Sequence, residues 1–322
     1  MEIGLIVILL FFSFLVVALA ALAVLLGLAL SLPPGLFASS AVVIALAGLA
    51  GFALCVPPLW KVFGDPRKTA DHDAANPGPE SFTAISRSSG DWWSDPPIFF
   101  ALWMSVVVLA YSAVNHLAFA LIPDAVDSAL AEVGTITPTV IVLGQLPFAV
   151  IALCGVGFGV RRNFREALAR LGYGAITLSQ LGISALFIAG ALLLSFAADW
   201  LFATLQPGLY ERVGEVSEGL FSPEGLSPIS AILFALLIGV GAGLGEETLF
   251  RGAVQPALGI TLTSILFASI HVQYGPSLLL GYLFLISVGL GLLRKHINTT
   301  ASFAAHAGYN TSGVLLTYFF GL

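Results

Sequence analysis

Two adjacent glutamates and an arginine interrupt an otherwise apolar stretch of this sequence. Glu246 and Glu247 are followed, after three uncharged residues, by Arg251. Charged groups are costly inside a membrane helix, so these residues are candidates for a functional site. In a helix, Glu247 and Arg251 share one face and can form an ion pair. Glu246 lies about 100° around the helix without that partner, and such a carboxylate can act as a general base. The alternative is that all three charges are solvated groups at a helix end.

Two histidines in neighbouring apolar segments add polar groups to this pattern. His271 stands four residues after Phe267, and His306 stands four residues before Asn310. Residues four apart lie on one face of a helix, so His306 and Asn310 present two hydrogen-bonding groups together. A third histidine, His116, is alone in its segment, and we expect it to make a hydrogen bond between helices.

The depth of these groups follows from the rise of a helix. Proline and glycine at 256–259 predict a turn between two membrane segments. Glu246 lies roughly 20 Å from that turn along its helix and His271 roughly 18 Å, whereas His306 lies roughly 12 Å from the same side. We therefore expect Glu246, His271, His306 and Asn310 to meet in one cavity in the cytoplasmic half of a helix bundle.

The composition explains why these elements must be membrane helices. Of the 322 residues, 58% are hydrophobic and only 9% are charged, and the mean hydropathy is +1.00. A soluble domain carries roughly 25% charged residues, so most of the outer surface here must face lipid. The net charge of −6 argues against a nucleic-acid partner, which would need a basic surface. Cys55 and Cys154 lie in apolar runs and do not indicate a disulfide framework.

A membrane-spanning helix needs roughly 20 apolar residues. The predicted fold class is therefore all-α, a polytopic bundle of about nine transmembrane helices, or eight if the short seventh segment is a partial span. The candidate segments are 4–30, 40–62, 97–122, 138–160, 174–204, 229–256, 260–274, 277–293 and 299–320. The first segment is longer than a signal-peptide core of roughly 7–15 residues, so it is expected to be retained.

The charges of the connecting loops predict an orientation. Lysine and arginine gather after the second, fourth and eighth segments, whereas the loops after the third and fifth segments are acidic. The positive-inside rule then places the N-terminus in the cytoplasm and the C-terminus outside, in the plasma membrane. The polar stretch 64–94 is expected to be a cytoplasmic loop.

The three motifs together resemble those of the CPBP family of membrane proteases. That family contains CAAX prenyl proteases of the Rce type and bacterial ABI-type proteases. The motifs Glu246-Glu247-x-x-x-Arg251, Phe267-x-x-x-His271 and His306-x-x-x-Asn310 occur in the family's order, and the resemblance covers about residues 229 to 314. It implies a catalytic membrane core in residues 174–322, preceded by helices of unassigned role in residues 1–173.

The resemblance implies a glutamate-dependent intramembrane endopeptidase that cleaves a membrane-associated protein or peptide. Glu246 would activate water, and His271 would help to hold that water. His306 and Asn310 would stabilise the oxyanion, with Glu247, Arg251 and Phe267 in support. Hydrolysis requires these two functions, a base for water and donors for the oxyanion. No metal is required in this scheme.

Several alternatives remain open from the sequence. Glu246, His271 and His306 also have the ligand types of a three-ligand zinc site, as in a metalloendopeptidase. The chain could instead be a non-catalytic membrane scaffold or immunity-type protein of the same fold, or a transporter that moves protons through a buried carboxylate. The pattern His-Glu-x-x-His of many metalloproteases is missing. A CAAX tail, a leader peptide and a sorting tail are all compatible substrates.

Overall fold

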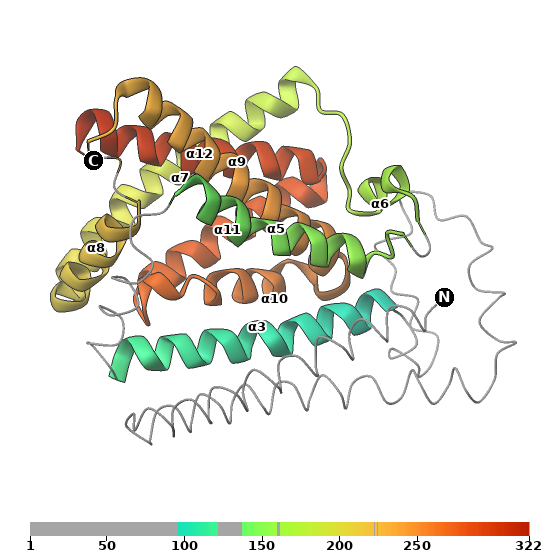
Figure 1. The fold of residues 1–322 in the computed structure, drawn as a ribbon, viewed down its shortest axis with the longest axis horizontal. Coiled ribbons are helices and arrows are strands. Elements are labelled where there is room, and N and C mark those ends of the chain that lie inside the picture. The colour runs from blue at the N-terminus through green and yellow to red at the C-terminus, as the bar shows by residue number, and fades with distance from the viewer. Residues whose placement is uncertain (1–95, 122–136, 160–161, 222, 224, 322) are drawn as a thin grey trace, which may run out of the picture. The chain divides into compact units, whose positions relative to one another are not determined.

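The structure, a computed structural model, describes residues 96–121, 137–159, 162–221, 223 and 225–321 (Figure 1). The regular elements of these residues are all helices, which confirms the all-α class for this part of the chain. The predicted segments 4–30 and 40–62 and the predicted loop 64–94 lie outside the described residues. The chain divides into two compact units, Met1–Tyr111 and Ser112–Leu322, and the second carries the candidate site.

Each predicted segment from 97 onwards contains a helix, and the last agrees at both ends, whereas α5 ends before its predicted segment does and α10 begins and ends before its own. In chain order the elements are α3 (Pro96–Leu121), α5 (Pro138–Gly155), α6 (Phe164–Arg170), α7 (Leu178–Leu205), α8 (Pro207–Phe221), α9 (Pro228–Glu246), the π-helix η3 (Glu247–Val254), α10 (Gln255–Ser269), the 3₁₀-helix η4 (Val272–Tyr274), α11 (Leu279–His296) and α12 (Thr299–Phe320).

Helix α8 occupies a stretch that the sequence analysis treated as a loop. It carries acidic side chains on one side, while Val213 and Val216 on the other side are buried against Phe202 of α7. Apolar residues at helical spacing can form an amphipathic helix even when the segment is too polar to span a membrane. Because this stretch has no long apolar run, its sequence did not predict a helix.

Four helical stretches among the described residues are long and apolar enough to cross a membrane, and this agrees with a multi-pass membrane protein. They are Pro138–Gly155, Leu178–Leu205, Pro228–Ser269 and Leu279–His296. The count of nine transmembrane helices and the predicted orientation stay predictions. The predicted boundary near residue 173 also stays a prediction.

The stretch Pro228–Ser269 contains a reversal at Gly259. This glycine has a φ of 75° and a ψ of 177°, outside the helical range. His271 lies about 25 residues after Glu246, which would separate them by roughly 37 Å in one straight helix. Their side chains are instead 4.0 Å apart. The predicted turn at 256–259 is therefore confirmed, and the chain folds back there so that α10 packs against η3 and two motifs come together.

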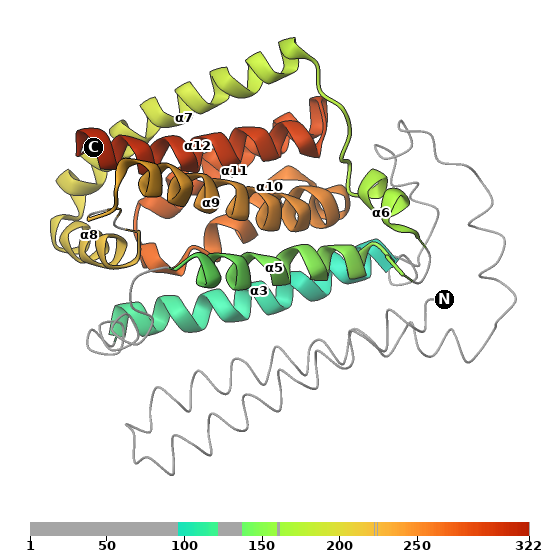
Figure 2. The ribbon, with the colours of Figure 1, turned by 45° about the horizontal axis from the view of Figure 1, so that its top comes forward.

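Helix α9 lies between α5 and α12 (Figure 2). Its glycines allow both neighbours to approach closely. A Cβ atom at Gly243 would lie 3.2 Å from Phe303 and 3.3 Å from Ala307 of α12. On the α5 side, a Cβ atom at Gly241 would lie 3.0 Å from Ile141. Small residues permit such contacts between membrane helices, so the glycines of α9 set the spacing at the centre of the bundle.

Polar caps fix where the site helices begin. Ser227 accepts a hydrogen bond from the backbone N–H of Ser230 at the start of α9, and Pro228 occupies the first turn. Asn298 accepts a hydrogen bond from the backbone N–H of Ala301 at the start of α12. Such caps satisfy N–H groups that have no partner within the helix. The register of each motif relative to its helix end is thereby defined locally.

Candidate active site

The acidic motif lies where α9 becomes the π-helix η3. Glu246 is the last residue of α9, and η3 begins at Glu247. A π-helical turn is rare and often occurs at functional sites. Glu246 is 7% exposed, while Glu247 and Arg251 are fully buried. This burial excludes the alternative that the three charges are solvated groups at a helix end.

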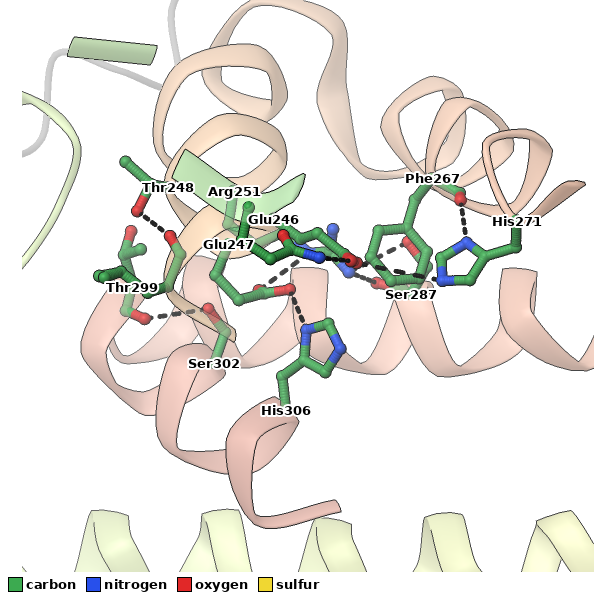
Figure 3. A network of polar contacts seen from close by, with 12 residues as sticks. Glu246, Glu247, Thr248, Arg251, Phe267, His271, Ser287, Thr299, Ser302 and His306 are labelled. Atoms are coloured by element: carbon green, nitrogen blue, oxygen red, sulfur yellow. Dashed lines mark hydrogen bonds and ion pairs between the residues drawn. The ribbon is translucent and has the colours of Figure 1, made fainter. Parts of the chain in front are cut away.

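Glu247 and Arg251 form the predicted ion pair. Arg251 Nε lies 3.3 Å from Glu247 Oε2, and Arg251 Nη2 donates a hydrogen bond of 3.1 Å to Ser287 Oγ of α11. The guanidinium group also lies over the ring of Phe267, 4.5 Å from its centre. Moving a charge from water into the protein interior costs free energy, so a buried charge needs such partners. The pair ties η3 to α10 and α11 (Figure 3).

His306 is bonded to the second glutamate of the pair. Its Nδ1 atom lies 2.9 Å from Glu247 Oε1. A carboxylate only accepts, so Nδ1 carries the proton and Nε2 is left for another partner. Glu247 therefore bridges Arg251 and His306 with its two oxygens (Figure 3). The sequence predicts His306 near Glu246 and only Arg251 beside Glu247, whereas the structure places His306 on Glu247.

His271 faces Glu246 across a short gap. Its Nδ1 atom lies 2.8 Å from the backbone oxygen of Phe267, and a carbonyl can only accept, so Nδ1 carries the proton. The Nε2 atom then presents a lone pair in the neutral ring, and it lies 4.0 Å from Glu246 Oε2. This distance is too long for a direct hydrogen bond and suits two polar atoms that share one water molecule.

Phe267 holds both histidine rings in place. Its ring centre lies 4.8 Å from that of His271 and 5.8 Å from that of His306. It also makes an edge contact with Phe250 of η3 at 5.5 Å, and its side chain is 1% exposed. Aromatic pairs prefer such tilted arrangements. One buried ring therefore orients the histidines of two motifs.

Asn310 is the one predicted site residue that the structure does not bond to the others. It lies in α12, four residues after His306, and is partly exposed. In the part of the chain that the structure describes, it makes no hydrogen bond. Glu246, Glu247, Arg251, Phe267, His271 and His306 do come together. The role expected for Asn310 stays a prediction.

Three further residues contact the site and were not singled out from the sequence. Gln145 of α5 donates a hydrogen bond of 3.3 Å to Glu246 Oε1. Ser287 accepts a hydrogen bond from the Arg251 guanidinium. Tyr274 of η4 stacks on His271 with ring centres 6.2 Å apart. A polar Gln in an apolar segment is a detectable signal. Serine and tyrosine are too common in membrane helices to stand out.

The connection between α6 and α7 is joined to η3 and α12 by hydrogen bonds. The hydroxyl of Thr248 donates to the backbone oxygen of Leu244, so the Tyr173 hydroxyl, 2.6 Å away, must donate to Thr248. Burial raises the pKa of Tyr173, and the phenol therefore keeps the proton for this bond. Nearby, Thr299 of α12 donates to the backbone oxygen of Leu171. These bonds tie the connection to both η3 and α12.

Glu246, His271 and His306 are the ligands of the alternative zinc site. No three His, Cys, Asp or Glu side chains are grouped so as to hold a metal ion within the described ranges of the chain. Zinc binding by these three residues stays a prediction.

Comparison with known proteins gives one match. Residues 228–312 match the family described as type II CAAX prenyl endopeptidase Rce1-like. These residues, about a quarter of the chain, run from the start of α9 into α12 and contain all three motifs. No curated protein and no solved structure matches the chain.

Proposed function

We propose that this protein, whose residues 228–312 match the Rce1-like family, is an intramembrane endopeptidase in which Glu246 activates the attacking water. The observation that carries the proposal is the 4.0 Å separation between Glu246 Oε2 and His271 Nε2. A water molecule between these atoms can donate one proton to each of two acceptors. General-base catalysis requires such a contact between base and water.

In the proposed reaction, Glu246 takes a proton from this water while the water oxygen attacks the peptide carbonyl carbon. The carbonyl oxygen becomes an oxyanion, and a bond to the water oxygen forms. Glu246 then returns the proton to the departing amine as the C–N bond breaks. Glu246 therefore acts first as a general base and then as a general acid, so it gains no proton over the two steps. No step requires a metal ion.

His306 is proposed to stabilise the oxyanion. With Nδ1 on Glu247, the ring offers an Nε2–H donor when it carries both protons. The Glu247 carboxylate is a matching counter-charge for that form. Asn310, one turn further along α12, is the proposed second donor. Fixed donors aimed at a developing oxyanion are among the largest contributions to such catalysis.

The proposed substrate is a membrane-associated peptide or protein. The candidate site is buried among helices that are apolar enough to span a membrane, so a substrate would have to reach it from the bilayer. The matched family is described as a CAAX prenyl endopeptidase, and a prenylated tail is therefore the first substrate class to try. The basic loops support a site that opens towards the cytoplasm in the plasma membrane.

The test is peptide cleavage by purified protein in liposomes. Prenylated and unprenylated membrane-tethered peptides would be compared with the wild-type chain and Glu246→Gln. We expect the wild type to cleave at least one class, and Glu246→Gln to lose about 10³-fold or more in kcat, in the range seen when a catalytic base is removed. Equal cleavage by the variant would contradict the mechanism. Proton flux without cleavage would favour a transporter instead.

A further inference from the structure

Gln145 approaches Glu246 from outside the matched region. It lies in α5, in the part of the chain whose role the motifs leave unassigned. Its side-chain Nε2 donates a hydrogen bond of 3.3 Å to Glu246 Oε1. An amide with no partner in an apolar helix is costly to insert. The contact with Glu246 gives this polar residue a partner at the centre of the bundle.

This hydrogen bond makes the two oxygens of Glu246 different from each other. Oε1 receives the Gln145 amide, and Oε2 faces His271 Nε2. A carboxylate with one oxygen fixed cannot rotate freely about its last bond. The oxygen proposed to accept the proton of water is thereby held towards His271.

The neighbouring helix has space for this contact because Gly245 lacks a side chain. A Cβ atom at Gly245 would lie 2.5 Å from Gln145 Oε1 and 2.7 Å from the backbone oxygen of Gln145. Real Cβ atoms do not approach so closely, so a larger residue at Gly245 would push Gln145 away. The glycine directly before the acidic motif therefore admits a residue from α5 to that motif.

We infer that Gln145 is a positioning residue that orients the Glu246 carboxylate to accept a proton from the attacking water. The inference rests on the proposed function. It also gives α5, which precedes the matched region, a role in the site. A positioned base depends on supporting groups that hold its geometry, and Gln145 is such a group for Glu246.

A pair of variants separates positioning from simple packing. Gln145→Met keeps a similar length without a hydrogen-bond donor. Ile141→Ala removes packing one turn away, where Ile141 faces Gly241 of α9. We expect Gln145→Met to lower kcat by about 10- to 100-fold, with KM and the unfolding temperature close to wild type. Ile141→Ala should lower the unfolding temperature with a much smaller change in kcat.

The outcomes also distinguish this inference from the proposed function. A wild-type chain that cleaves no peptide would overturn the proposed function itself. If the wild type cleaves, Glu246→Gln is inactive and Gln145→Met is fully active, only the role of Gln145 is overturned. A parallel fall of kcat in Gln145→Met and Ile141→Ala would overturn it as well. Gln145→Leu provides the same comparison if Gln145→Met does not insert stably.

Discussion

Nδ1 of His306 lies 2.9 Å from Oε1 of Glu247, and the other carboxylate oxygen of Glu247 lies 3.3 Å from Nε of Arg251. The second glutamate of the motif therefore links the arginine of η3 to the histidine of α12. The first glutamate has a separate set of neighbours, Gln145 and His271. Adjacent carboxylates thus serve two different groups of contacts, one that binds the helices together and one that faces the proposed water.

Glu247→Gln should destabilise the fold. It leaves the fully buried Arg251 without its counter-charge, and breaking a buried pair costs about 3–5 kcal/mol in the free energy of unfolding. Unfolding in detergent, followed by denaturant or heat, measures this loss. The double variant Glu247→Gln/Arg251→Met should recover much of the stability. A single variant as stable as the wild type would show that the pair is not structural.

His306→Ala should lower kcat by about 10²- to 10³-fold, as the loss of an oxyanion donor does in other hydrolases. Steady-state cleavage of a tethered peptide in liposomes would measure it. His296→Ala is a matched control, because His296 lies at the end of α11 outside the site. Unchanged kcat in His306→Ala would remove this histidine from the mechanism.

Asn310→Ala tests the one predicted site residue that has no partner within the described residues. If its amide is the second oxyanion donor, kcat should fall by about 10²-fold while KM changes little. Proton flux across the same liposomes should be unaffected by this substitution. A loss of flux together with unchanged cleavage would contradict the assignment.

Gly259→Ala should strain the turn that brings Glu246 and His271 together. The φ of 75° at Gly259 belongs to a region that is essentially restricted to glycine, and the strain costs about 1–3 kcal/mol. Nothing lies within 4 Å of a Cβ atom there, so the effect would come from the backbone alone. Gly190→Ala in α7, which is helical and equally open, should be neutral or stabilising. Equal unfolding temperatures for both variants would contradict the argument.

Chelation tests the zinc alternative. Because the proposed reaction uses the Glu246 carboxylate as its base and draws on no metal ion, we expect cleavage to persist after treatment with 1,10-phenanthroline or EDTA. The metal content of the purified protein should be measured alongside activity. Loss of cleavage that is restored by added zinc would favour a metalloendopeptidase and contradict the metal-free mechanism.

Local sequence was sufficient for much of the helical scaffold. The segment 299–320 matches α12 at both ends, and the turn at 256–259 is present at Gly259. His116 makes the expected bond between helices, with Nε2 lying 3.1 Å from the backbone oxygen of Ser269. These features depend on apolar length, on glycine and on polar groups that need a partner. Helix α8 was missed because an amphipathic helix lacks a long apolar run.

The membrane character and the order of the three motifs follow from the residues alone. So does the ion pair between Glu247 and Arg251, because residues four apart in a helix are neighbours whatever surrounds them. The contacts of His306 with Glu247 and of Gln145 with Glu246 arise only from the packing of the helices. Those contacts depend on how α5 and α12 are rotated against α9. That rotation follows from packing across glycine surfaces on both sides of the helix, which no local spacing specifies.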